Sequence, residues 1–330
     1  MSATLMIAAA ALVSCKSQNN KKNNDMSENE SIVYFTKEIS PESLVKIYKA
    51  LGKEATGRVA VKISTGEAGN TNYLKPELIA GLVKEVNGTI VECNTAYLPS
   101  ERFTSESHRK LVHEHGFDAI APVDLMDEEG DMKIPVQDTT WLKYDIVGKH
   151  LANYDFMINL AHFKGHPMGG LGGVLKNQSI GVASASGKTY IHTAGSVENV
   201  DSLWEHAGNQ DGFLESMAAA AQAVHEYLHG NVIYIDVMNN MSVDCDCVGY
   251  GAAEPAKIAD MGILASLDPV ALDQACVDKV FNLTPSEGND NAPLIERINR
   301  QHGIHTIEHA EKIGLGSRTY KIVDLDAEAE

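Results

Sequence analysis

The sequence predicts an α/β fold in one large domain, with a largely parallel sheet and helices on both of its faces. Short, strongly apolar segments of strand type alternate with segments of ten or more residues that have helical spacing. No repeat and no proline- and serine-rich linker interrupts residues 31–330. The chain has 330 residues, of which 44% are hydrophobic and 22% are charged, and this composition is sufficient for a full globular core.

The predicted elements alternate along the chain and begin with a helix. Ser40, Pro41 and Glu42 are typical of a helix start, because serine caps the first turn and proline is tolerated there. Glycine follows most of the predicted helices, which cover residues 40–51, 76–87, 104–115, 211–229 and 269–281. The predicted strands are short and rich in β-branched residues, and they cover residues 59–63, 89–93, 156–160, 232–237 and 262–265.

The first thirty residues have the pattern of an export signal followed by a tether. Residues 3–13 are apolar, too few to span ~30 Å of hydrocarbon, and typical of a signal-peptide core. They lead into Leu12-Val13-Ser14-Cys15, which resembles a bacterial lipobox, and residues 16–30 are polar and rich in Asn and Lys. We therefore expect a lipoprotein signal peptide at 1–15, lipidation of Cys15 and a flexible tether at 16–30. The protein would be lipid-anchored in the bacterial cell envelope and face the periplasm.

The charge balance excludes several classes of partner. Lys and Arg total 27 against 45 Asp and Glu, which gives a formal net charge of −18. A chain this acidic repels phosphate backbones, so we expect no nucleic-acid binding. For the same reason, we expect contact with a membrane only through the lipid anchor. The five cysteines are too few for a disulfide framework.

The segment 159–181, NLAHFKGHPMGGLGGVLKNQSIG, directly follows a predicted strand and has an unusual density of histidine, lysine and glycine. Its imidazoles, at His162 and His166, are candidate metal ligands. Glycines let the backbone approach a ligand closely, so four of them are candidate cofactor-binding residues: Gly169, Gly170, Gly172 and Gly173. The candidate catalytic residues are Lys164, Lys176 and Asn177. The alternative is a surface glycine loop with incidental polar side chains.

The segment 238–250, MNNMSVDCDCVGY, also directly follows a strand. Two thiols and two carboxylates lie within residues 244–247, and a bound cation would remove the repulsion between these acidic groups. Cys245 and Cys247 are therefore candidate metal ligands. A strained Cys-x-Cys disulfide and a pair of buried free thiols are the alternatives.

Two smaller polar segments, 62–72 and 92–97, follow apolar strands as well and contribute Glu67 and Asn94 as candidate cofactor-binding residues. Loops that leave the carboxyl ends of parallel strands lie at one edge of the sheet, where ligands bind. We therefore expect the four polar loops to converge on one crevice that takes a small-molecule substrate. A divalent metal, zinc or iron, would be held there by a set of two nitrogens and two sulfurs, from His162, His166, Cys245 and Cys247.

Several stretches in the same order resemble the domain-of-unknown-function 362 family, whose members are often described as iron–sulfur centre proteins. The stretches are VAVKISTGEAGN (59–70), ECNTAYLPSER (92–102), HGF (115–117), HFKGHPMGGLGGVLKN (162–177), GKTYIH (187–192), DCDC (244–247), DMGILASLDPVALDQA (260–275) and EHAEKIGLGSRTY (308–320). Many members carry a cysteine-rich, ferredoxin-like insert, whereas residues 193–210 contain no cysteine. We therefore expect no [4Fe–4S] cluster in this chain.

A more distant likeness is to the nickel-pincer lactate racemases, in which a Lys-x-His and a later lysine hold the cofactor. Lys164, His166 and Lys176 have a similar spacing. Three functions are therefore considered. The first is a metal-dependent enzyme, with redox activity as one form, acting on a small molecule. The second is a non-enzymatic metal-binding or sensory lipoprotein. The third is a racemase or isomerase with a lysine-held cofactor.

Overall fold

The computed structural model describes residue 1 and residues 30–250 and 254–327. Cys15, and nearly all of the predicted signal peptide and tether, lie outside the described residues. In the part that is described, no helix combines the length and the apolar character that crossing a membrane requires.

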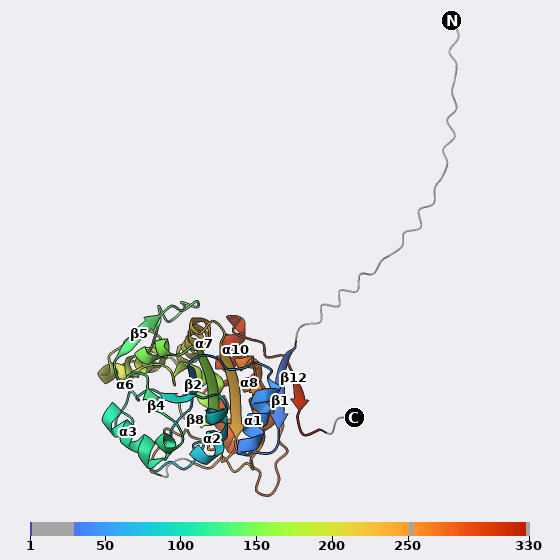
Figure 1. Ribbon diagram of the computed structural model, residues 1–330. Helices are drawn as coiled ribbons and strands as arrows, with labels where there is room; N and C mark the ends of the chain where they lie inside the picture. The colour runs from blue at the N-terminus through green and yellow to red at the C-terminus, as the bar shows by residue number, and fades with distance from the viewer. Residues whose placement is uncertain (2–29, 251–253, 328–330) are drawn as a thin grey trace.

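An eight-stranded sheet forms the centre of the described structure, in the order β12-β1-β11-β10-β7-β2-β3-β4 (Figure 1). β11 is antiparallel to both of its neighbours, and every other neighbouring pair in this sheet is parallel. Its strands are β1 (Ser31–Thr36), β2 (Val59–Lys62), β3 (Thr89–Glu92), β4 (Val123–Leu125), β7 (Phe156–His162), β10 (Val232–Met238), β11 (Gly262–Ser266) and β12 (Tyr320–Asp324).

Helices cover both faces of this sheet. Successive strand residues point to opposite sides, and apolar side chains on both sides must be buried. Val59 and Val61 of β2 pack in one apolar cluster with α1 and α2, whereas Ala60 belongs to a second cluster with α4, α7 and α8. The helices are α1 (Pro41–Ala50), α2 (Pro76–Glu85), α3 (Ser105–Glu114), α4 (Val174–Ser179), α5 (Ala185–His192), α6 (Leu203–His206), α7 (Gln210–Tyr227), α8 (Pro269–Phe281), α9 (Ala292–Arg300) and α10 (Ile304–Lys312). The predicted fold class, a largely parallel α/β sheet, is confirmed.

The structure adds two small antiparallel pairs, β5 (Asp131–Ile134) with β6 (Asp145–Gly148) and β8 (Lys164–His166) with β9 (Gly170–Gly172). The second pair means that the predicted glycine loop is a short hairpin. β7 also continues two residues beyond its predicted end, to His162, and all seven of its residues are buried. The sequence pattern does not predict this extension, because the partners that bury Asn159 and His162 are distant in sequence.

Candidate functional site

A cavity of about 390 Å³ lies at the carboxyl-terminal edge of the parallel strands. Its wall includes Lys62 at the end of β2, Glu92 at the end of β3, His166 in the hairpin after β7, and Cys245 and Cys247 in the loop after β10. These parts of the wall come from the ends of four strands that all run in the same direction. The structure therefore brings the four polar segments together at one edge.

The cavity wall is rich in cationic side chains, although the whole chain carries a formal net charge of −18. Its cations are Lys62, Arg102, Lys164, Lys176 and Lys188. Two of them have partners that neutralise their charge: Arg102 Nη1 lies 2.8 Å from Glu92 Oε1, and Lys164 Nζ lies 2.8 Å from Asp246 Oδ2. The remaining lysines leave an excess of positive charge, which favours an anionic ligand.

Lys176, on α4, differs from the other lysines of this wall, whose amines have polar partners. No hydrogen bond or ion pair between described residues involves its Nζ atom, and burial, together with the nearby Lys164 and Arg102, lowers its pKa to about 7. Burial also lowers the pKa of Lys62, to about 8, although Glu92 opposes this shift. An amine whose pKa lies near neutrality is partly uncharged at pH 7 and can then accept a proton or attack an electrophile.

Asn177 lies next to Lys176 and fixes α4 against the sheet. Its Nδ2 donates to Asn159 Oδ1 on β7, at 2.7 Å, and to the carbonyl of Lys62 on β2, at 3.0 Å. Its Oδ1 accepts a hydrogen bond from Lys62 Nζ at 3.1 Å. Because its amide is fully engaged, Asn177 positions Lys62 and Lys176 within the cavity wall.

His162 is not brought into a metal site. Its Nδ1 lies 2.9 Å from Asp246 Oδ1 and its Nε2 lies 2.6 Å from the Asn239 carbonyl oxygen. Both ring nitrogens are thus engaged with oxygen atoms of the chain itself, so neither is open to a metal. The predicted set of two nitrogens and two sulfurs thus lacks one of its nitrogens. The pattern could not show this, because Asn239 and Asp246 reach His162 from a different segment of the chain.

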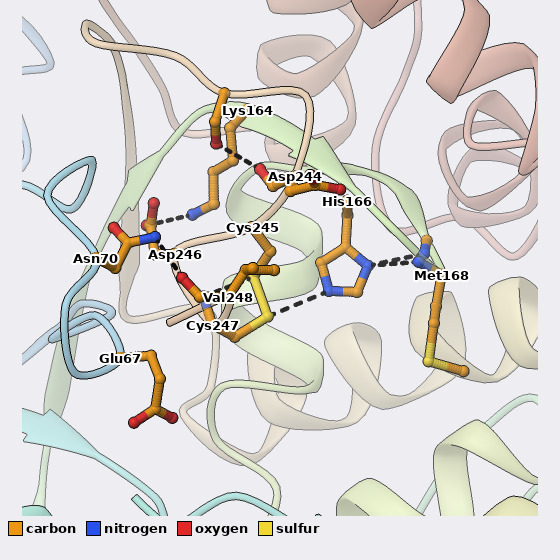
Figure 2. The surroundings of a disulfide bond; sticks show 12 residues. Glu67, Asn70, Lys164, His166, Met168, Asp244, Cys245, Asp246, Cys247 and Val248 are labelled. Carbon is orange, nitrogen blue, oxygen red and sulfur yellow. Dashed lines mark hydrogen bonds and ion pairs between the residues drawn. A yellow bond between two sulfur atoms is a disulfide. The ribbon is translucent and has the colours of Figure 1, made fainter. Parts of the chain in front are cut away.

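His166, Cys245 and Cys247 do come together, and their ligand atoms all lie within 4.8 Å of one another. This group could hold a metal ion. In the structure, however, the two sulfurs are joined in a disulfide with a Cα–Cα distance of 5.0 Å. Figure 2 shows the His166 ring between the Cys247 sulfur on one side and the Met168 backbone on the other. The Cys-x-Cys disulfide, named above as an alternative, is therefore the form present.

His166 and His192 both line the cavity, and their neutral rings are opposite tautomers. The Nδ1 atom of His166 accepts hydrogen bonds from the backbone N–H groups of Met168 and Gly169, at 3.1 and 2.8 Å, so its proton is on Nε2. In His192, Nδ1 lies 2.7 Å from the Lys188 carbonyl and must donate, which leaves a free lone pair on Nε2. Burial lowers the pKa of both imidazoles, to about 4 at His192, so both are neutral at pH 7.

The family model described as a domain of unknown function, DUF362, matches residues 59–278. That is two thirds of the chain. The chain belongs to this family. All of the residues that line the cavity, from Lys62 to Val248, fall within the part of the chain that defines DUF362.

The DUF362 chain is also similar to solved structures. One is the lactate racemase apoprotein from Thermoanaerobacterium thermosaccharolyticum, with 16% identity, a TM-score of 0.35, and coverage of 63% of this chain and 50% of that one. Another is a protein from Thermotoga maritima, with 13% identity, a TM-score of 0.39, and coverage of 65% and 52%. The chain spans about half the length of each of these structures. No curated protein matches the chain.

The DUF362 structure places the remaining candidate cofactor-binding residues in two groups. Gly172 and Gly173 line the cavity. Glu67 and Asn94 are not part of its wall: the Glu67 carboxylate accepts from the Glu101 backbone N–H at 2.9 Å, and Asn94 Nδ2 donates to Ser105 Oγ at 2.9 Å. These two side chains therefore brace the loops behind the wall.

Two of the four glycines are required for packing. A side chain on Gly170 would lie 2.7 Å from Gly303 Cα, and one on Gly173 would overlap Asp273 Oδ1. Gly169 contributes its backbone N–H to His166. At Gly170 and Gly173, the glycines predicted to approach a ligand instead approach other parts of this DUF362 chain.

Sequence reasoning missed several residues of the cavity: Lys62, Glu92, Arg102, Lys188 and His192. Two of them had a visible signal, because Lys62 and Glu92 are charged residues at the ends of the apolar segments VAVK and TIVE. Burial raises the pKa of Glu92, but Arg102 and His108 together hold it well below its ordinary range. Glu92 is therefore a fixed carboxylate that orients Arg102.

Proposed function

We propose that the protein is an enzyme that binds a small organic anion in this cavity and uses the Lys176 amine as its reactive base. The observation that carries the proposal is the Lys176 amine, which has no polar partner among the described residues and a pKa of about 7, inside a cavity with several cationic side chains. Apolar side chains form another part of the wall, including Met168, Ile180 and Trp204. A lining that combines cationic and apolar side chains suits a molecule that combines a carbon skeleton with a carboxylate or phosphate.

The cavity would bind an anionic group and remove a proton, and different side chains would perform these two tasks. Lys62 and Lys188 would attract and orient the anionic group. The neutral form of Lys176 would take a proton from the bound molecule, and a base with a pKa near the working pH is well matched to this role. His166 Nε2–H and the His192 Nε2 lone pair supply one neutral donor and one neutral acceptor for the rest of the substrate.

Trp204 provides the test, because it lines the cavity and is one of two tryptophans in the chain. In a Trp141→Phe background, pyruvate and succinate should change the Trp204 fluorescence in a saturable way, whereas their neutral amides, pyruvamide and succinamide, should not. At pH 6, below the Lys176 pKa of about 7, Lys176→Met should weaken anion binding about tenfold or more, because it removes a cation from a site of low dielectric constant, and the loss should be smaller at pH 8. The matched control is Lys84→Met, an exposed lysine on α2. Equal binding of acids and amides would contradict the proposal.

A metal-dependent enzyme is the second candidate, favoured by the group of His166, Cys245 and Cys247. Zinc or iron could bind only after reduction of the disulfide, and the proton on His166 Nε2 opposes coordination, since ligating histidines normally donate through their other nitrogen. Metal content that appears on reduction and disappears in Cys247→Ser would favour this candidate. The sensory alternative predicts metal binding without turnover.

The racemase alternative places a covalent cofactor on Lys176, and an excess in intact mass that is absent from Lys176→Met would reveal it.

We also propose that the protein acts in the bacterial cell envelope, anchored through Cys15. This location is supported by the lipobox-like sequence Leu12-Val13-Ser14-Cys15.

A further inference from the structure

The disulfide between Cys245 and Cys247 forms part of the cavity wall. Both cysteines line the cavity, but they differ in exposure: Cys245 is only 4% exposed, whereas Cys247 is partly exposed. Cys93 and Cys276 are free and buried. Of the described cysteines, Cys247 is therefore the one that a molecule in the cavity reaches most readily.

Each sulfur of the disulfide has its own N–H group. The backbone N–H of Cys247 donates to Cys245 Sγ, at 3.2 Å. The Nε2 atom of His166, which carries the ring proton, lies 3.9 Å from Cys247 Sγ. Both donors are held in place before any reaction, so either sulfur can accept negative charge when the S–S bond breaks.

The carboxylates of the DCDC sequence do not oppose that charge. Asp246 points away from the sulfurs toward Lys164 (Figure 2), and it also forms an ion pair with His162. Asp244 forms an ion pair with Arg297. The repulsion expected from the sequence is therefore neutralised by distant residues, and the cations of the cavity set the charge around the disulfide.

We propose that the Cys245–Cys247 disulfide is a redox centre that exchanges with small anionic thiols entering the cavity. The exchange follows from the more exposed Cys247 and from the N–H donor beside each sulfur, and only the preference for an anionic thiol rests on the proposed function.

The exchange proceeds in two balanced steps. An incoming thiolate attacks Cys247 Sγ, a mixed disulfide forms there, and the electron pair of the broken S–S bond goes to Cys245 Sγ, next to the Cys247 N–H. A second thiolate attacks the sulfur of the bound thiol and releases Cys247 as a thiolate next to His166 Nε2–H. Two small thiols are oxidised to one disulfide, the protein disulfide is reduced to two thiols, and the two protons of the small thiols pass to Cys245 and Cys247.

The first test uses the unmodified full-length chain and three thiols of similar size but different charge. These are 2-mercaptoethanesulfonate, 2-mercaptoethanol and 2-mercaptoethylamine. Reduction of the disulfide, followed by mass spectrometry and corrected for the thiolate fraction of each probe, should be about tenfold or more faster with the anionic thiol than with the cationic one. Lys176→Met should reduce this preference, and Lys84→Met should preserve it.

The second test traps the intermediate. Cys245→Ser should form a mixed disulfide with the disulfide of 2-mercaptoethanesulfonate, located at Cys247 by peptide mapping, whereas Cys247→Ser should form none at Cys245. A native disulfide that resists all three thiols, yet is reduced after unfolding, would be structural and would overturn the inference while leaving anion binding intact. Equally fast reduction by all three thiols would retain the redox centre and contradict the anion-binding cavity.

Discussion

At the level of single residues, two buried aspartates, Asp246 and Asp145, have pKa values shifted in opposite directions. Burial raises the pKa of Asp246, but His162 and Lys164 reverse the effect and hold it well below its ordinary range. Asp145, on β6, has one carboxylate oxygen bonded to the Ile146 backbone N–H, while its Oδ2 is buried and has no hydrogen-bond partner in the described part of the chain. Burial therefore raises the pKa of Asp145 to about 7, because nothing nearby fully compensates the charge.

This difference predicts how Asp145→Asn changes the pH dependence of stability. A folded pKa above the unfolded value means that the stabilisation is complete below about pH 4 and is lost as the pH rises through about 7. The unmodified chain should therefore lose about 2 kcal/mol more than Asp145→Asn between pH 5 and pH 8. Urea unfolding at both pH values measures the loss, and any constant packing cost of the amide cancels in the comparison. Parallel pH profiles would contradict the unpaired carboxylate.

At the level of elements, the cavity depends on how the short helix α4 is held. Asp273 on α8 accepts hydrogen bonds from the backbone N–H groups of Val174 and Leu175, at 2.8 and 3.1 Å, and so fixes the first turn of α4. Gly173 precedes this turn and leaves the space that the Asp273 carboxylate occupies. The position of Lys176 in the cavity wall is thus set by a residue that is distant in sequence.

Gly173→Ala should therefore destabilise the fold and weaken the cavity together. The new methyl group would overlap Asp273 Oδ1, so the helix or the carboxylate must move, at a cost of about 1–3 kcal/mol. Thermal unfolding and Trp204 fluorescence titration with pyruvate should both change. Gly208→Ala is the matched control, because a methyl group at this position would have no atom within 4 Å and both readouts should stay unchanged. Loss of binding in the control as well would show that the effect is not specific to α4.

At the level of the whole molecule, the charge is divided between an acidic exterior and a cationic cavity. The formal net charge of −18 includes the lysines and the arginine that line the cavity, so the rest of the chain is more acidic still. We propose that such a distribution keeps the protein away from anionic lipid surfaces and draws small anions to one place. Attachment to a membrane would then depend on the lipid alone.

Cys15→Ala tests that attachment. If Cys15 is the lipidated residue, the variant should move from the membrane fraction into unprocessed or soluble material, because a single cysteine carries the anchor. Detergent phase partitioning of both forms, followed by immunoblotting, measures the change. Cys93→Ala is a suitable control, since Cys93 is buried in the fold. Unchanged partitioning of Cys15→Ala would contradict the lipobox assignment.

The sequence by itself determined the fold class and the edge of the sheet where the cavity lies. Both follow from local patterns, because the alternation of strand and helix implies a parallel sheet and each polar segment directly follows an apolar strand. His166, Lys164, Lys176, Cys245 and Cys247 were selected in this way, and the structure places all five in the cavity wall.

Only the tertiary structure decided what these residues do. His162 and His166 look alike in sequence. In the structure, both ring nitrogens of His162 are bonded to Asp246 and Asn239. In His166, two backbone N–H groups bond to Nδ1 and so place the ring proton on Nε2. The protonation state and the accessibility of a side chain depend on its neighbours in space, and those neighbours come from segments that the chain brings together only when it folds.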